Sequence, residues 1–230
     1  MSEFLIELHM HTSEVSPCGK VSAREGIRLY KSLGYDAVVI TDHFLSNYFD
    51  SLKRLSWREQ VDHYLSGYRM AADEGEKLGL KVFLGLEFCV PGTNDDILVY
   101  GLDEQFLYDR EDLCRLDSGS FAKKAQNQNL LLVQAHPFRT YISRVYDEII
   151  EGMEVHNGNP RHESNNSKAM AYAIQNNLIA VSGSDFHQPQ DAGTGGTYLS
   201  EMPGNSQELV SYLREQKNPK LVKEKAPLIK

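Results

Sequence analysis

The sequence is poor in cysteine and in positive charge, and it contains no long apolar run. Its three cysteines form no Cys-x-x-Cys pair, which favours a reduced intracellular protein over a disulfide-stabilised one. No apolar run approaches the ~18 residues that a membrane helix needs, and the first residues lack a basic-then-apolar signal. We therefore expect a cytoplasmic protein with no membrane partner. The net charge of −8 argues against nucleic acid as a partner, because nucleic-acid binders usually carry basic patches.

A chain of 230 residues, 41% of them hydrophobic, has the length of one domain and can build a sizeable core. Short apolar runs alternate along most of it with segments of helical periodicity. This alternation predicts an α/β fold with a parallel sheet. The seven expected strands are residues 4–8, 36–40, 81–86, 97–101, 130–135, 152–155 and 177–181.

The segments between these strands carry helix signals. Ser22 is a candidate N-cap, and Gly34 ends the helix that it opens. Residues 103–118 give no clear pattern, and 197–199 are strand-like. Helices are expected at about 22–33, 56–78, 120–128, 162–176 and 206–216.

Side chains that can bind metals follow the expected strands at their C-terminal ends. They are His9 and His11 after the first strand, His43 after the second, Glu87 after the third, His136 after the fifth, and Asp185 and His187 after the seventh. Active sites of (β/α) barrels gather at this end of the strands, whereas a doubly wound open sheet concentrates its ligands at one switch point. The distribution around the whole rim favours a barrel.

This set of side chains predicts a metal centre. Imidazole and carboxylate ligands together suit zinc, manganese or iron better than calcium or magnesium. Seven candidate ligands are more than a single catalytic zinc uses, so we expect at least two ions. Glu87 and Asp185 are the carboxylates available to bridge them.

The motifs resemble, in the same order along the chain, those of the PHP superfamily, which includes histidinol phosphatases and polymerase-associated phosphoesterases. They are His9-x-His11, Thr41-Asp42-His43, Gly85-Leu86-Glu87, His136-Pro137 and Ser184-Asp185-x-His187. The resemblance implies a distorted seven-stranded (β/α) barrel, a TIM-like fold, formed by residues 1–230 as a single domain. It also implies two or three bound divalent transition metals, which would be zinc, manganese or iron.

Two positions depart from the family's motifs. The loop after the His-x-His pair usually carries an Asp or His that binds a metal, and here it offers Glu14 and Cys18. Glu14 is the predicted ligand, because it has the reach and the harder donor. The fourth strand usually carries a further His, and 97–101 has none. Its candidate substitutes are Asp95, Asp96 and Asp103.

Other residues on the same rim are candidates for substrate binding. Arg139 lies three residues past His136 and could clamp a phosphate bidentately. His156 and Asn157 follow the sixth strand and are candidate substrate contacts, while Glu154 before them is expected to face the barrel. The other cysteines and histidines are interpreted as structural or surface residues: Cys89, Cys114, His63 and His162.

Together these features predict a metal-dependent phosphoesterase acting on a small phosphorylated substrate. Bound metals would activate a water for attack on phosphorus, and His187 or His43 would protonate the leaving alkoxide. One alternative is a metal-dependent amidohydrolase, which commonly uses a strand-end lysine that is not visible in this sequence. Another is a regulatory module that binds metal without turnover. Neither the alcohol in the substrate nor the oligomeric state follows from the sequence.

Overall fold

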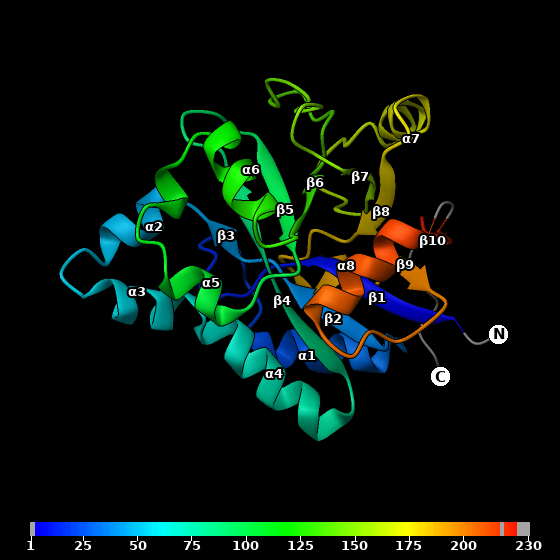
Figure 1. Ribbon diagram of the computed structural model, residues 1–230. Helices are drawn as coiled ribbons and strands as arrows, with labels where there is room; N and C mark the ends of the chain where they lie inside the picture. Colours follow the sequence, from blue (N-terminus) through cyan, green and yellow to red (C-terminus); the bar gives the residue numbers. More distant parts are fainter. Residues whose placement is uncertain (1–2, 217–218, 225–230) are drawn as a thin grey trace.

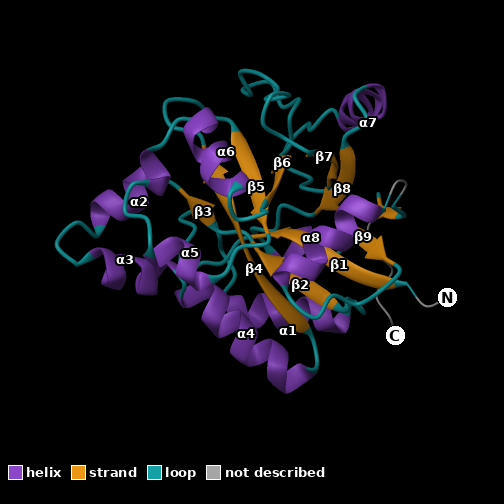
Figure 2. Ribbon diagram, viewed as in Figure 1, coloured by secondary structure: helices purple, strands orange, loops and turns teal. Residues whose placement is uncertain are grey.

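The computed structural model describes residues 3–216 and 219–224, so both ends of the expected 1–230 domain lie outside the described residues. Strands gather at the centre of the molecule and helices surround them, as Figure 1 and Figure 2 show. Within the described residues, no helix is both long and apolar enough to span a membrane.

All seven expected strands are present, with ends within three residues of the predicted ones. The described strands are β1 (Phe4–Met10), β2 (Ala37–Ile40), β3 (His43–Phe44), β4 (Lys81–Cys89), β5 (Asp96–Tyr100), β6 (Leu131–Gln134), β7 (Gly152–Asn157), β8 (Ile179–Gly183), β9 (Gly196–Leu199) and β10 (Leu221–Val222). Their order in the sheet is β10-β9-β1-β2-β4-β5-β6-β7-β8, and the short β3 pairs with β4.

The sheet closes almost completely between β8 and β1. At the C-terminal end of β1, Met10 forms a parallel bridge with Phe186, which follows β8. At the other end, β9 runs antiparallel to β1, and Thr197 on β9 accepts a hydrogen bond from the backbone N of Ser182 at 2.9 Å. The seven strands from β1 to β8, β3 excepted, therefore form the barrel that the motifs predict.

The expectation of a wholly parallel sheet is wrong at β5, which runs antiparallel to both β4 and β6. Only residues 90–95 separate β4 from β5. A parallel pair needs a crossover of a dozen or more residues, whereas an antiparallel pair can be joined by a short turn. The reversal brings the N-terminal residue of β5, Asp96, to the rim where the other strands end.

All five predicted helices are present, one of them as two helices, and α2 and α5 lie in segments for which no helix was predicted. The described helices are α1 (Ala23–Ser32), α2 (Ser46–Ser51), α3 (Trp57–Tyr64), α4 (Ser66–Leu78), α5 (Glu104–Tyr108), α6 (Ser118–Gln126), α7 (Asn166–Gln175) and α8 (Ser206–Glu215), with short 3₁₀ turns at Leu113–Arg115 and Pro189–Asp191. The single helix expected at 56–78 is two, separated at Leu65. On either side of this residue, the Tyr64 hydroxyl donates to the carbonyl of Asp42, and Gly67 packs closely against Thr12. These tertiary contacts leave no trace in the apolar periodicity.

Apolar side chains fill the barrel below the site. Leu8, Val39, Leu98 and Val181 belong to a buried cluster that also includes Val210 of α8 at the end of the barrel opposite to Asp96. Separate clusters lie between the strands and the outer helices, such as α1 and α4. The polar residues of the predicted site therefore stand at one open end of an apolar barrel.

Candidate metal centre and active site

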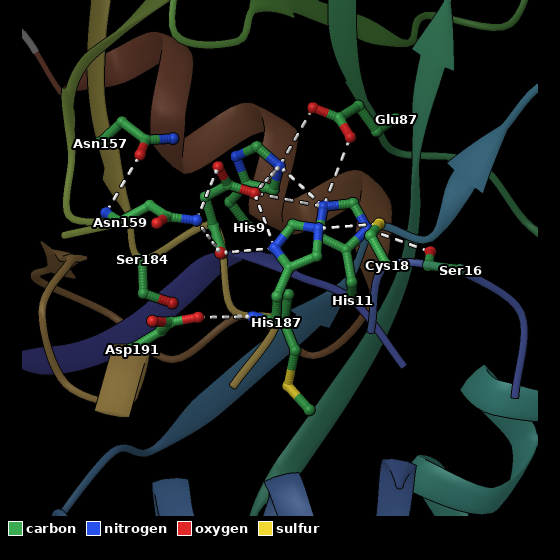
Figure 3. A network of polar contacts seen from close by, with 12 residues as sticks. His9, His11, Ser16, Cys18, Glu87, Asn157, Asn159, Ser184, His187 and Asp191 are labelled. Carbon is green, nitrogen blue, oxygen red and sulfur yellow. Dashed lines mark hydrogen bonds and ion pairs between the residues drawn. The ribbon is translucent and has the colours of Figure 1, made fainter. Parts of the chain in front are cut away.

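His9 and His11 end β1 at the mouth of the barrel. Side chains two residues apart leave the same face of a strand, and their Nε2 atoms are 3.1 Å apart, with both rings fully buried. Figure 3 shows these imidazoles turned toward that of His187, with Glu87 above them and Cys18 beside them.

Glu87, on β4, lies among four histidines. Its Oε1 is 3.1 Å from Nε2 of His9 and 3.3 Å from Nε2 of His136. Its Oε2 is 2.7 Å from Nδ1 of His43 and 3.3 Å from Nε2 of His11. Both oxygens are buried, yet neither has a partner in hydrogen-bonding geometry. Since buried polar atoms are rarely left unpaired, this arrangement fits a carboxylate and imidazoles that hold cations between them.

Asp185 approaches the same histidines from the end of β8. Its Oδ1 is 3.5 Å from Nε2 of both His9 and His11, and 3.2 Å from Nδ1 of His187. The backbone of Asp185 has φ of 50°, and that of His136 has φ of 29°. Non-glycine residues rarely adopt this left-handed region, which costs about 1–3 kcal/mol and is often found at functional sites.

The structure brings together every predicted metal ligand except Glu14. Three of the four groups of potential ligand atoms within the described residues consist of these side chains, and the atoms of each group lie within 4.8 Å of one another: His9, His11 and Asp185; His9, Glu87 and His136; and His11, His43 and His187. Because His9 and His11 each belong to two groups, the candidate sites are adjacent. Nitrogen and carboxylate donors in this combination fit transition-metal ions.

The charges in this cluster depend on one another. Burial alone would lower the pKa of His9, but the carboxylates of Glu154 and Glu87 raise it well above its ordinary value. Burial and the neighbouring His43 lower the pKa of His11 well below its ordinary value. Burial would raise the pKa of Glu87, but His9 and His43 hold it well below its ordinary value. Because metal ligands must be deprotonated, bound cations would displace the protons that the cluster otherwise holds.

The loop after β1 presents Cys18, and not Glu14, to this cluster. Both oxygens of Glu14 accept a hydrogen bond from the backbone N of Ala23, at 3.2 and 3.0 Å, where α1 begins and where a carboxylate is stabilised by unpaired helix amides. The carboxylate of Glu14, the predicted ligand, therefore caps α1 and belongs to none of the groups of potential ligand atoms. Sγ of Cys18 lies 3.0 Å from Nε2 of His187. Burial would raise the pKa of Cys18, but hydrogen bonds with His187 and His43 lower it to about 6.

Asp42 determines the path of this loop. Its Oδ1 accepts hydrogen bonds from the backbone N of Thr12 and from Oγ of Ser16, both at 2.7 Å. Oγ of Ser16 in turn lies 3.2 Å from Nδ1 of His11. Asp42 belongs to one of the motifs in the sequence, but its spacing there gives no sign of this role.

Glu7 was not predicted as a site residue either. Its Oε1 accepts hydrogen bonds from the backbone N of His9 at 2.8 Å and of Ser184 at 2.9 Å, so it joins the two motifs that end β1 and β8. Burial raises its pKa to about 7, and its Oε2 has no partner. The sequence did contain a signal: Glu7, His9 and His11 are two residues apart, so their side chains leave the same face of the strand.

Glu154, on β7, faces the barrel interior, as expected. Its Oε1 lies 2.9 Å from Nδ1 of His9. Its Oε2 accepts hydrogen bonds from the backbone N of His136 at 2.9 Å and from Nδ2 of Asn157 at 2.8 Å. Partners of this kind fix the orientation of metal-binding imidazoles.

Of the three aspartates considered for the missing strand-four histidine, Asp96 stands at the site. It pairs with Cys89 in the β4–β5 ladder, and its Oδ2 is 3.8 Å from Nε2 of His136. Burial and the charge of Glu87 raise its pKa to about 6. Asp95 instead accepts a hydrogen bond from the Tyr146 hydroxyl at 2.7 Å, which ties the turn of the β4–β5 hairpin to the segment that follows β6.

Asp103 caps helix α5 by accepting a hydrogen bond from the backbone N of Phe106 at 2.9 Å.

Cys89, interpreted as structural, is closer to the site than expected, with Sγ 3.5 Å from Nδ1 of His43. Together with His43 and Asp96 it forms a fourth group of potential ligand atoms. The hairpin that reverses β5 therefore adds Cys89 and Asp96 to the rim.

Arg139 is buried in the wall of the site. Its Nη2 donates to Oδ2 of Asp185 and to Oδ1 of Asn157, both at 2.7 Å. Its Nη1 donates to the Tyr141 hydroxyl at 3.0 Å, and its Nε to Oγ of Ser164 at 3.1 Å. These bonds use four of the five guanidinium hydrogens, which leaves one on Nη1. Asn157 thus acts on the pocket through Arg139.

His156 does not face the pocket, contrary to its prediction as a substrate contact. Its Nε2 lies 3.1 Å from the carbonyl of Thr194, and its Nδ1 lies 3.1 Å from Nδ2 of Asn166. The register of β7 against β8 shifts between Glu154 and His156. Such a bulge re-aims the side chains that follow it, so His156 packs outside the barrel.

A pocket of about 260 Å³ opens over this cluster. His43, His136, Asp185, His187 and Cys18 line it from below. Its walls include Arg139, Tyr141, Arg161 and His162, the last of which was interpreted as a surface or packing residue. Arg161 is itself paired with Asp191, its Nη2 lying 2.8 Å from Oδ2. A cavity with candidate metal ligands below and guanidinium groups beside it suits an anionic substrate.

The fold is a barrel, and side chains that can hold more than one metal ion cluster at its rim. This combination is typical of a class of metal-dependent enzymes. The family model described as PHP domain matches residues 7–218, and the chain belongs to this family. A search of the curated proteins finds no match.

Solved structures share the fold. A two-domain protein from Bacteroides vulgatus, described as containing a predicted PHP-like metal-dependent phosphoesterase, has 18% identity and a TM-score of 0.71, covering 97% of this chain and 65% of that one. PsfC from Pseudomonas syringae has 16% identity and a TM-score of 0.68, covering 97% and 92%. The lesion-specific endonuclease PfuEndoQ from Pyrococcus furiosus has 16% identity and a TM-score of 0.61, covering 96% and 58%. The chain therefore spans less than two thirds of the Bacteroides and Pyrococcus proteins.

Proposed function

We propose that this protein is a metal-dependent phosphoesterase that hydrolyses a small phosphorylated molecule at a di- or trinuclear site. The observation that carries the proposal is Glu87, a fully buried carboxylate with unpaired oxygens and imidazole nitrogens of four histidines within 3.3 Å. Membership of the PHP family and the cationic wall of the pocket support the same activity.

The ligands that we propose fall into three groups. His9, His11 and Asp185 would hold one ion; His9, Glu87, His136 and Asp96 a second; and His43, His187 and Cys18 a third. Zinc, manganese or iron suits such donors. Ions held there supply Lewis-acid activation of water and neutralise charge on the phosphoryl group.

The remaining roles fall to side chains of the pocket. In hydrolysis the oxygen of water bonds to phosphorus, the bond from phosphorus to the alcohol oxygen breaks, and a proton must reach that oxygen. His187 and His43 both line the pocket. In a site that holds only the first two ions they are not ligands, and they are then the groups that we propose to supply this proton. Arg139 would bind a phosphoryl oxygen through its free Nη1 hydrogen, held in place by Asp185 and Asn157.

The alternatives make different demands on the site. An amidohydrolase of the kind considered above commonly uses a lysine, and no lysine lines this pocket within the described residues. A nucleic-acid substrate would resemble that of the Pyrococcus endonuclease, but the net charge of −8 favours a small substrate.

The three free cysteines support a reducing compartment such as the cytoplasm, and the family match over 7–218 supports a single domain.

Metal analysis of the purified protein, paired with a screen of phosphate monoesters, phosphodiesters and amides, tests the proposal. We expect at least two transition-metal equivalents per chain and metal-dependent phosphate release. Glu87→Gln should lose both, whereas Glu76→Gln, an exposed change on α4, should lose neither. One ion or fewer after reconstitution, or hydrolysis of amides alone, would contradict the proposal.

Kinetics of an Arg139 variant test the substrate-binding role. Losing a charge-assisted hydrogen bond should raise KM by roughly ten- to a hundredfold in Arg139→Ala, with a smaller fall in kcat. Lysine should rescue this only in part, because an ammonium group cannot replace a planar guanidinium that is held by Asp185 and Asn157 while one Nη1 hydrogen reaches the substrate. Arg144→Ala, an exposed arginine nearby, is the control. Unchanged kcat/KM would remove Arg139 from phosphate recognition, and a matching loss of metal would show that it chiefly supports Asp185.

A further inference from the structure

A second hollow of about 680 Å³ lies beside the pocket that contains the metal centre. It is formed between the β4–β5 hairpin and the segment that leads into α2. Three residues line both cavities: His43, Asp96 and Tyr141. The two spaces therefore adjoin at these three side chains, and a molecule that passes over them would reach both.

The two cavities differ in the charges that they present. The smaller one contains Arg139 and Arg161 in addition to the candidate ligands. The larger one has no lysine or arginine among its described lining residues, and its titratable groups are the shared His43, Asp96 and Tyr141 together with the thiol of Cys89. An anionic group would therefore find guanidinium groups in the smaller cavity and none among the described lining residues of the larger one.

The walls of the larger cavity combine apolar and uncharged polar side chains. Leu45, Val90 and Pro91 supply apolar surface, and Asn47 and Asn94 supply amides that can donate and accept hydrogen bonds. Binding sites for small molecules commonly have this composition, with apolar walls and a few placed polar groups. The cavity suits an uncharged molecule with a broad apolar face and some hydrogen-bonding groups.

Tyr141 stands where the two cavities meet. Its hydroxyl accepts a hydrogen bond from Nη1 of Arg139 at 3.0 Å, which links it to the anionic side of the site. The residue is 43% exposed, unusually open for a large aromatic side chain in this protein. Its ring lies 6.3 Å from that of His162 in an edge-to-face arrangement. An aromatic ring held at its hydroxyl end and exposed over much of its surface can pack against a flat ligand group.

We propose that the larger cavity binds the alcohol portion of the phosphoester, and that this alcohol is uncharged and carries a ring or another broad apolar surface. Tyr141 packs against that surface, and the phosphoryl group lies in the smaller cavity. The assignment rests on the proposed phosphoesterase function and adds the class of substrate. It excludes alcohols with a carboxylate or a second phosphate at the far end.

Equilibrium binding of phosphonates, which are not hydrolysed, tests this without turnover. On metal-loaded protein, calorimetry should find that phenylphosphonate binds more tightly than methylphosphonate. Tyr141→Ala should reduce that difference by roughly three- to tenfold, the usual contribution of an aromatic pair, and Tyr141→Phe should preserve it. Ile174→Ala, which removes a side chain 73% exposed on α7, is the control and should change nothing.

A charge substitution tests the exclusion of anions. Propylphosphonate should bind more tightly than 3-phosphonopropionate, which adds a carboxylate at its far end. Asn94→Lys, an exposed change on the hairpin, should narrow that gap by roughly two- to fivefold, the scale of an exposed ion pair. Equal binding of phenyl- and methylphosphonate, or equal losses for both in Tyr141→Ala, would overturn the assignment of the cavity alone. If no phosphonate binds, the phosphoesterase proposal fails as well.

Discussion

Oε1 of Glu154 lies 2.9 Å from Nδ1 of His9, while its other oxygen accepts a hydrogen bond from the backbone N of His136. One buried carboxylate on β7 thus orients two proposed metal ligands that come from β1 and from the end of β6. Gly183 on β8 leaves room for it, because a Cβ there would lie 2.9 Å from Oε1 of Glu154 and 2.5 Å from Cβ of His9.

Glu154→Gln should therefore weaken metal binding without unfolding the protein. A carboxamide has one acceptor oxygen, so it can satisfy either His9 or the backbone of His136, and it directs its NH₂ group at the other donor. We expect a loss of roughly ten- to a hundredfold in metal affinity, measured by competition with a chelator. Glu151→Gln, an exposed change nearby, is the control. Wild-type affinity in Glu154→Gln would show that this carboxylate does not orient the ligands.

The proposed role of Cys18 predicts a spectroscopic difference. Cobalt-substituted protein should show the near-ultraviolet absorption of a thiolate bound to cobalt, and Cys18→Ser should lose that band together with one metal equivalent. Cys114→Ser is the matched control, because that thiol is buried in the core away from the site. Persistence of the band in Cys18→Ser would assign the sulfur ligand to Cys89.

Glu14→Gln should behave differently from Cys18→Ser. Since the Glu14 carboxylate accepts hydrogen bonds at the start of α1, its loss should lower the free energy of unfolding by about 0.3–1 kcal/mol and leave the metal content intact. Thermal unfolding and elemental analysis of the same sample measure both. Loss of a metal ion in Glu14→Gln would restore the interpretation that the sequence first suggested.

The strand-end positions could be predicted because each depends on local pattern. His9, His43 and Asp185 each lie within four residues of the end of a short apolar run, and the rim of a barrel then brings such ends together. Glu14 and Cys18 could not be told apart in this way. Their directions depend on Asp42, a residue of the next strand segment that holds Thr12, and no local pattern reports that contact.

Other differences have separate physical causes. The direction of His156 could not be predicted, because a bulge in β7 changes the alternation of side chains, and no glycine or proline lies between Glu154 and His156 to mark it. The reversal of β5, in contrast, was readable: residues 90–95 include Pro91 and Gly92 and are too few for a crossover. Because a connection this short allows only an antiparallel β5, the sequence alone places Asp96, at the start of β5, on the rim.

Asp96 provides a test of the position where the family usually has a histidine. Asp96→Ala should lose one metal equivalent, and Asp96→His should restore it, because an imidazole there can reach the same ion as His136. Asp103→Asn is the control, since Asp103 only caps α5. Elemental analysis gives the result. Full metal content in Asp96→Ala would mean that His9, Glu87 and His136 hold that ion without help.

His156 predicts a pH dependence of stability that is separate from the metal centre. Nδ2 of Asn166 donates to its Nδ1, so the bonded ring is neutral, and burial lowers its pKa below the ordinary value. The unfolded chain therefore binds more protons than the folded one at acidic pH. The stabilising contribution is complete above about pH 6.5 and is lost as the pH falls from there through the lowered folded-state pKa.

His156→Gln should consequently lose less stability than the wild type between about pH 7 and pH 5, a window set by the ordinary histidine pKa of about 6.5. The measurement is the midpoint of thermal unfolding at each pH, in the presence of excess chelator so that metal binding does not contribute. His63→Gln, an exposed change on α3, is the matched control and should follow the wild-type profile. The glutamine amide can still donate to the carbonyl of Thr194, so the variant should fold. Parallel profiles for wild type and His156→Gln would mean that this imidazole takes up a proton as readily in the folded protein as in the unfolded chain.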